Sequence, residues 1–111
     1  MAAPDAVISI TITDETNKTT ITITNQEIIK DFYTVMDQQK FLEGSEPSST
    51  VNYTIRAISA QDQKDIYTVK IGESIIVSTI DGNVVYENTY QAVDETRLIS
   101  NLGAFFQKNS R

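Results

Sequence analysis

Residues 7–24 alternate between isoleucine and small polar residues, and this two-residue period constrains the fold more than any other feature of the sequence. The isoleucines at positions 8, 10, 12, 21 and 23 alternate with serine and threonine at positions 9, 11, 13, 20, 22 and 24. Successive side chains of a β-strand point to opposite faces of its sheet, so the pattern predicts two strands that each bury one face. The polar segment 14–18 has the length of a hairpin loop. We therefore expect an antiparallel hairpin whose hydroxyl side chains face water.

The period changes to that of an α-helix directly after this hairpin. Six apolar residues fall on one arc of a helical projection, with the charged residues Lys30, Asp31 and Asp37 outside it: Ile28, Ile29, Phe32, Val35, Met36 and Leu42. Thr24 and Glu27 have the spacing of a capping box, in which each side chain accepts a hydrogen bond from the other residue's backbone N–H. Gly44 occupies the position at which a left-handed residue often ends a helix. These features predict a helix over residues 25–43.

Alternation returns at residue 51 and continues to residue 90. It predicts a last hairpin with a tight turn at Asp81-Gly82, and four strands at 51–57, 67–71, 74–80 and 83–90. The tyrosines of these strands are expected to point into the core: Tyr53, Tyr67, Tyr86 and Tyr90. Apolar residues then recur at helical spacing from Leu98 to Phe106, which predicts a second amphipathic helix near the end of the chain.

The element order ββαββββα predicts an α+β fold. Hairpin-length connections favour a mostly antiparallel sheet of about six strands, and two helices with one apolar stripe each would cover one of its faces as a two-layer sandwich. The 111 residues are enough for one domain and too few for two. We expect a single domain over residues 7–108, preceded by a disordered leader at residues 1–6 and followed by a tail at residues 109–111.

The sequence has no cysteine and no histidine. It therefore lacks the usual ligands of structural zinc, the nucleophile of thiol enzymes and the base of imidazole-dependent triads. Its four glycines are too far apart for a phosphate-binding loop, and its acidic pairs lack the spacing of a calcium loop. Carboxylate pairs for glycoside hydrolysis are plentiful, but a domain of this length leaves little room for a deep cleft. We expect no enzyme, no catalytic residue, no metal ligand and no cofactor.

The net charge of −6 repels phosphate backbones and anionic lipid surfaces, and the basic residues are scattered. We therefore expect no nucleic-acid partner. No apolar run approaches the roughly 20 residues of a membrane-spanning helix. The first residues contain neither the basic region nor the apolar stretch of an export signal, which fits a cytoplasmic protein and equally a mature exported domain.

Two groups of residues form the predicted binding surface. Tyr33 lies at the margin of the first helix's apolar arc, and Phe41 falls on the opposite side, where it could anchor a partner or fold back under the next loop. The second group would offer hydroxyls on one face of the first hairpin to an ordered-water lattice, a glycan or another strand: Thr11, Thr13, Thr20, Thr22 and Thr24. The alternative is a structural role, because threonine is favoured in solvated strands.

Segment 24–30 opens a helix after a strand, Tyr53-Thr54-Ile55 lies in a later strand, and a tyrosine-containing strand follows Asp81-Gly82 before a short helix rich in leucine and phenylalanine. Over about residues 7–107 this arrangement resembles small lipid-anchored surface domains of Gram-positive bacteria, most of which have no known function. The resemblance implies a cell-envelope location and carries over no catalytic residue. Residues 28–33 also resemble the opening helix of nuclear-transport-factor-2-like cone folds, but in that family the helix precedes the sheet.

These observations lead to a functional hypothesis with two alternatives. We expect a non-catalytic domain of the cell envelope or extracellular space that interacts with another protein or a surface polymer. The first alternative is an acidic inhibitor or immunity-type protein that blocks a basic site on an enzyme or toxin. The second is a small hydrolase, which would need a cleft with perturbed carboxylates. Salt separates the first two, because binding through acidic residues weakens with ionic strength whereas apolar binding and strand addition change little.

Overall fold

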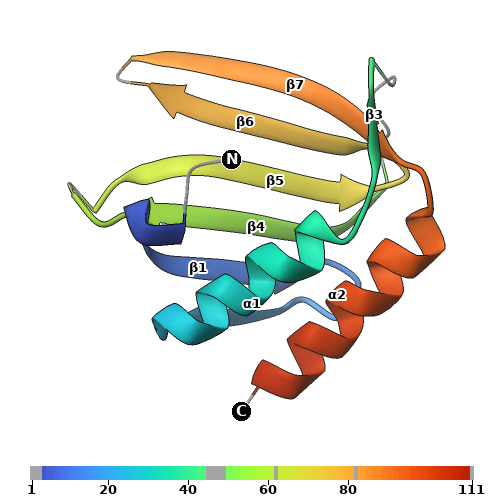
Figure 1. Cartoon of the computed structure of the whole chain (residues 1–111), viewed down its shortest axis with the longest axis horizontal. Helices are drawn as coiled ribbons and strands as arrows, with labels where there is room; N and C mark the ends of the chain where they lie inside the picture. The colour runs from blue at the N-terminus through green and yellow to red at the C-terminus, as the bar shows by residue number, and fades with distance from the viewer. Residues whose placement is uncertain (1–3, 45–49, 62, 82, 111) are drawn as a thin grey trace.

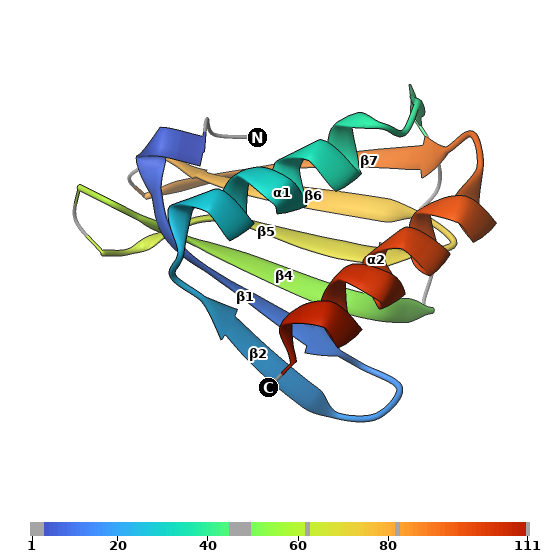
Figure 2. The ribbon, with the colours of Figure 1, turned by 60° about the horizontal axis from the view of Figure 1, so that its bottom comes forward.

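The computed structural model describes residues 4–44, 50–61, 63–81 and 83–110. Over these residues the chain forms one antiparallel sheet of seven strands, and two helices lie across one of its faces (Figures 1 and 2). The predicted two-layer α+β sandwich is confirmed, with one strand more than expected.

The strands follow the spatial order β2-β1-β4-β5-β6-β7-β3, and every neighbouring pair is antiparallel. β2 and β3 are the two edge strands of the sheet. The first helix connects them along the chain. The elements are β1 Val7–Asp14, β2 Thr19–Ile23, α1 Gln26–Asp37, β3 Phe41–Glu43, β4 Val51–Ser59, β5 Asp65–Gly72, β6 Ile75–Asp81, β7 Val84–Ala92 and α2 Glu95–Asn109.

The first hairpin has the predicted faces except at its start. Ile10, Ile12 and Ile23 are buried beneath the helices, as the alternation predicts. The pairing of β1 with β4 shifts between Val7 and Ser9, and this irregularity changes which side chains point inward. Val7 is therefore buried and Ile8 is 41% exposed. The expectation that Ile8 points inward was wrong.

The first helix is shorter than predicted and its cap lies one residue later. The side-chain oxygen of Asn25 accepts hydrogen bonds from the backbone N–H groups of Glu27 and Ile28, at 2.9 and 3.3 Å. Asn25, and not Thr24, is thus the N-cap, so the predicted capping box is wrong. The helix ends at Asp37, and Phe41–Glu43 forms β3 against β7, where ladder hydrogen bonds replace helical ones.

Regular secondary structure extends slightly beyond the predicted domain bounds of residues 7–108. Pro4–Ala6 forms a 3-10 helix that contacts α1, and the carbonyl of Ala6 accepts a hydrogen bond of 2.9 Å from the N–H of Ala60. At the other end α2 continues to Asn109, whose side-chain amide donates to the carbonyl of Phe105 at 2.9 Å. The rest of the leader, residues 1–3, and Arg111 lie outside the described residues.

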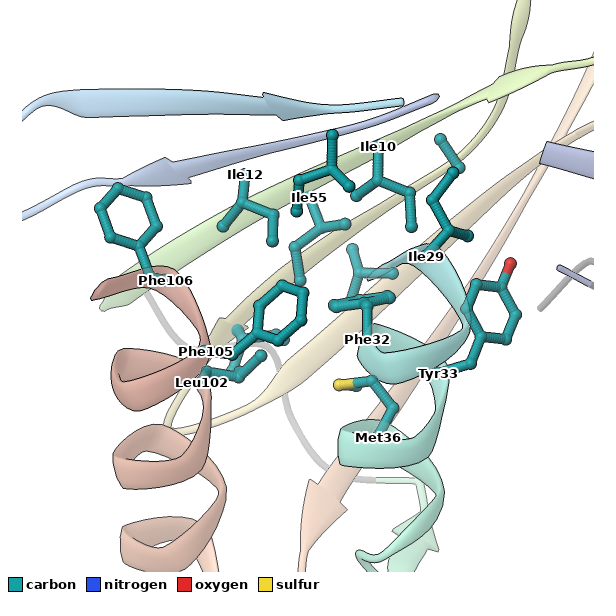
Figure 3. Close-up of a cluster of buried hydrophobic side chains, with 14 of the residues drawn as sticks. Ile10, Ile12, Ile29, Phe32, Tyr33, Met36, Ile55, Leu102, Phe105 and Phe106 are labelled. Carbon is teal, nitrogen blue, oxygen red and sulfur yellow. The ribbon is translucent and has the colours of Figure 1, made fainter. Parts of the chain in front are cut away.

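The hydrophobic core lies between the helices and the first strands of the sheet, as Figure 3 shows. Phe32 of α1 and Phe105 of α2 meet there with ring centroids 6.0 Å apart. Burying each large apolar side chain contributes about 1.5–3 kcal/mol, so the periodic apolar positions provide the main driving force for folding. The fully buried members from the sheet are Val7, Ile10, Ile55, Ala57, Tyr67, Val69 and Ile71.

Candidate functional site

Coverage of the inner face of the sheet, the face that carries the helices, decreases from β5 to β7. Cross-strand partners share a face, so each row of partners shows how far the helices reach. Tyr67 of β5 is fully buried, its partner Thr79 of β6 is half-buried, and the next partner, Tyr86 of β7, is 54% exposed. The row that begins at the buried Val69 ends in the same way, at the exposed Asn88. The turn end of the β6–β7 hairpin lies away from both helices (Figure 1).

Three consecutive apolar residues are exposed on this part of the hairpin. Val84, Val85 and Tyr86 are 49%, 61% and 54% exposed, and we call them the hairpin patch. Because neighbouring strand residues point to opposite faces, Val84 and Tyr86 project from the inner face and Val85 from the outer face. The patch is thus open on both sides. Exposed apolar side chains that lie close together, as Val84 and Tyr86 do on the inner face, can mark a protein interaction site.

An apolar groove continues the inner side of this region toward the end of α1. Its volume is about 240 Å³. Asp37 is its charged member, and the other described lining residues are Met36, Phe41, Val69, Ile75, Val77 and Tyr90. Ligand pockets usually measure ~300–1,000 Å³, so this groove suits one or two side chains of a partner better than a cofactor. Tyr90 and Tyr86 lie on the same face of β7 with Asn88 between them, so the groove and the inner-face residues of the patch lie along one strip of β7.

The structure gathers four of the five predicted threonines on the outer face. Thr11 pairs with Thr22 and Thr13 with Thr20, and the hydroxyls of the second pair are 3.0 Å apart. Thr24 follows the end of β2 and is exposed, so it lies outside this ladder. Thr11 and Thr13 are half-buried, whereas Thr20 and Thr22 are exposed.

The two predicted aromatic surface residues occupy different places. Tyr33 is buried, and its hydroxyl lies 2.8 Å from the hydroxyl of Tyr67 (Figure 3 shows Tyr33). Burial raises the pKa of both phenols, so both remain neutral at physiological pH. Tyr33 therefore belongs to the core and not to a binding surface. Phe41 is half-buried at the start of β3 and lines the groove, so it is not the isolated exposed anchor that a regular helix would have given.

Sequence reasoning missed the hairpin patch. Tyr86 was expected in the core because it keeps the alternation of its strand, but it is exposed. One signal was present: residues 84–86 are apolar in succession, and three neighbouring strand residues cannot all face one core. Such a run either lies between two covered faces or is exposed on one of them.

Asp14 is the buried carboxyl among the described residues. No group of three or more Asp, Glu, His or Cys residues that could hold a metal ion occurs among the described residues. Burial opposes ionisation of Asp14, but hydrogen bonds from Asn17 and Thr16 outweigh it and lower the pKa of this carboxyl. These bonds close the β1–β2 turn, so Asp14 has a structural role.

In the part of the chain that the structure describes, no helix is long and apolar enough to cross a membrane.

Comparison with known proteins adds no relative to this picture: no family model, no curated protein and no solved structure matches the chain.

Proposed function

We propose that this chain is a non-catalytic interaction domain of the cell envelope or extracellular space, and that it binds another protein through the hairpin patch and the adjoining groove. The observation that carries the proposal is the exposure of Val84, Val85 and Tyr86 next to an open apolar groove. The envelope location comes from the resemblance of the sequence pattern to lipid-anchored surface domains.

The chemistry of the strip favours a protein partner. Tyrosine is enriched among the residues that dominate binding energies, because it combines a large apolar ring with a hydroxyl and loses little conformational entropy. Tyr86 and Tyr90 supply two such side chains on one face of β7. The groove between Tyr90 and the end of α1 could accept one or two apolar side chains from the partner.

Site-specific photo-crosslinking tests this proposal. A photoreactive phenylalanine analogue replaces Tyr86 in one variant and Lys30, an exposed residue of α1, in the control. We expect a discrete crosslinked product with an envelope or extracellular protein from position 86 and none from position 30. Equal crosslinking from both positions, or none from position 86, would contradict the proposal.

The salt dependence of the captured complex distinguishes the proposal from the acidic-inhibitor alternative. An apolar contact at the strip should keep its affinity within about threefold between low and physiological ionic strength, whereas contacts through the acidic residues should weaken much more because salt screens them. Replacing Tyr86, which lies on the same face of β7 as the groove, with Asp should abolish the first kind of complex and leave the second largely intact.

A further inference from the structure

The sheet ends at β2 in a strand that has a neighbour on one side. β2 pairs with β1 over five residues, and no described strand lies along its other side. In an antiparallel ladder, alternate backbone N–H and C=O groups of an edge strand point outward and are available to another strand. The five residues Thr19–Ile23 carry no charge.

The two edges of the sheet differ in how they resist such pairing. Proteins usually protect edges with short strands, charged residues, proline or irregular backbone. The β3 edge has these features, because it is three residues long, contains Glu43 and is followed by Gly44 at a φ of +84°. β2 is longer, uncharged and built from β-branched residues with high strand propensity. An edge without protection is expected where pairing is part of the assembled state.

The side chains of β2 suit a second copy of the same strand. An antiparallel pair with its two-fold axis at Ile21 places Ile21 opposite the second copy's Ile21, and Thr20 opposite the second copy's Thr22. Threonine pairs and β-branched pairs are favourable cross-strand neighbours. The exposed hydroxyls would then continue the ladder that Thr13 and Thr20 already form at 3.0 Å. A symmetric arrangement of this kind closes on itself as a dimer.

The inner side of the edge also gains from a second copy. Ile21 is half-buried and, with Phe106 near the end of α2, forms the apolar part of an open hollow of about 480 Å³. The other lining residues of this hollow are polar: Asp14, Asn17, Thr19, Thr20, Gln107 and Ser110. A two-fold axis perpendicular to the sheet keeps both helical layers on one face, so the second copy's Ile21 would extend the apolar contacts at this hollow. The net charge of −6 opposes association, but the edge itself contributes none of it.

We propose that β2 is a homodimer interface, in which two copies pair their β2 strands antiparallel and join the two sheets. A single pair of five-residue strands buries less surface than a standard stable interface, so the dimer is in equilibrium with the monomer. This interface is separate from the hairpin patch and does not depend on the proposed function.

Sedimentation equilibrium of the full chain up to about 1 mM tests the proposal. We expect the mass to rise with concentration from 12.4 kDa toward twice that value. The variant T20K/T22K places four lysines at the interface and should raise the dissociation constant at least tenfold. The control T34K/T96K adds the same charge at exposed helix positions and should dimerise as well as the unmodified chain. Circular dichroism verifies that both variants are folded.

Hydrogen exchange of the unmodified chain provides a measurement that needs no variant. The amides of Thr19–Ile23 should exchange more slowly at high than at low protein concentration, while those of β3 should not change. The proposal is overturned if the chain stays monomeric at the highest concentration, if T20K/T22K dimerises like the control, if the control also loses the dimer, or if β2 exchange is independent of concentration.

Discussion

Two halves of one sheet differ in burial although their strands have similar patterns. In the covered half, formed by β1, β4 and β5, the inner-face residues Ile10, Ile55 and Val69 are completely buried. In the uncovered half, formed by the turn ends of β6 and β7, the inner-face residue Tyr86 is 54% exposed. Ile75 and Ala92, at the other ends of these two strands, are buried. Alternation therefore tells which side chains share a face, but the helical layer decides which of those faces become core.

The direction of the helices explains the difference. α2 contacts β2, β5 and β7, so it crosses the strands of the sheet and does not run along them (Figure 2). The ends of β6 and β7 that extend beyond the helices must expose their inner face or bind a further layer. The hairpin patch and the groove lie where this layer ends.

The largest expected effect compares one aromatic truncation in each half. Phe32→Ala removes a fully buried ring and should lower the free energy of unfolding by about 3–5 kcal/mol, because a cavity remains beneath the helices. Tyr86→Ala removes an exposed ring and should cost less than about 1 kcal/mol. Urea denaturation followed by circular dichroism measures both values.

If Phe32→Ala is too unstable to fold, the milder Phe32→Leu provides the same comparison at a smaller scale. Equal losses for the truncations at positions 32 and 86 would show that the β7 strip is part of the core, and the distinction between the two halves would fail.

A smaller effect is expected from a single hydroxyl. Tyr33→Phe leaves the fully buried Tyr67 hydroxyl without its partner at 2.8 Å, which should cost about 1–3 kcal/mol. Tyr86→Phe should stay within about 0.5 kcal/mol, because water solvates an exposed hydroxyl. Thermal and urea denaturation measure both.

The double variant Y33F/Y67F sharpens this test. Removing both hydroxyls also removes the unsatisfied group, so the double variant should lose less than the sum of the two single variants. Additive losses would mean that the two hydroxyls do not stabilise one another.

The sequence predicts the strands, the helices and the fold class because those follow from local period and from one apolar stripe per helix. β3 was missed because Leu42 also falls on the apolar arc of the helical projection, and the strand conformation of residues 41–43 depends on pairing with residues 90–92, which are distant in the chain. The same nonlocal contact ends the predicted helix early.

The candidate site was predictable to a smaller extent. The threonine ladder follows from alternation, and the structure brings four of its predicted members together. Tyr33 and Tyr86 were assigned to the wrong environments for one reason. Periodicity shows on which side of its helix or strand a side chain lies, but it does not show whether another element of the fold covers that side. The position of the helices over β1, β4 and β5 is fixed by packing among residues far apart in sequence.

The smallest expected effect concerns a charge inside the covered half. Asp14 is 7% exposed at the end of β1, and its carboxylate accepts hydrogen bonds from the backbone N–H groups of Thr16 and Asn17 and from the side chain of Asn17. Burial alone would raise its pKa, but these donors lower the pKa below the ordinary value of 3.8. A group with a lowered pKa stabilises the fold above the unfolded-state pKa, and this stabilisation is lost as the pH falls through the folded-state value.

Asp14→Asn should therefore cost about 1 kcal/mol at neutral pH, because a neutral amide oxygen accepts these bonds less strongly. The difference from the unmodified chain should shrink as the pH falls below about 4. Urea denaturation at neutral and acidic pH measures it, with Glu87→Gln on the exposed outer face of β7 as the control, expected to change neutral-pH stability by less than about 0.5 kcal/mol. If Asp14→Asn costs the same at both pH values, the N–H donors of the turn stabilise the turn conformation and do not favour the ionised carboxylate over the neutral carboxyl. A cost that shrinks with acid would show that the hydrogen bonds from Thr16 and Asn17 favour the ionised form of this carboxyl.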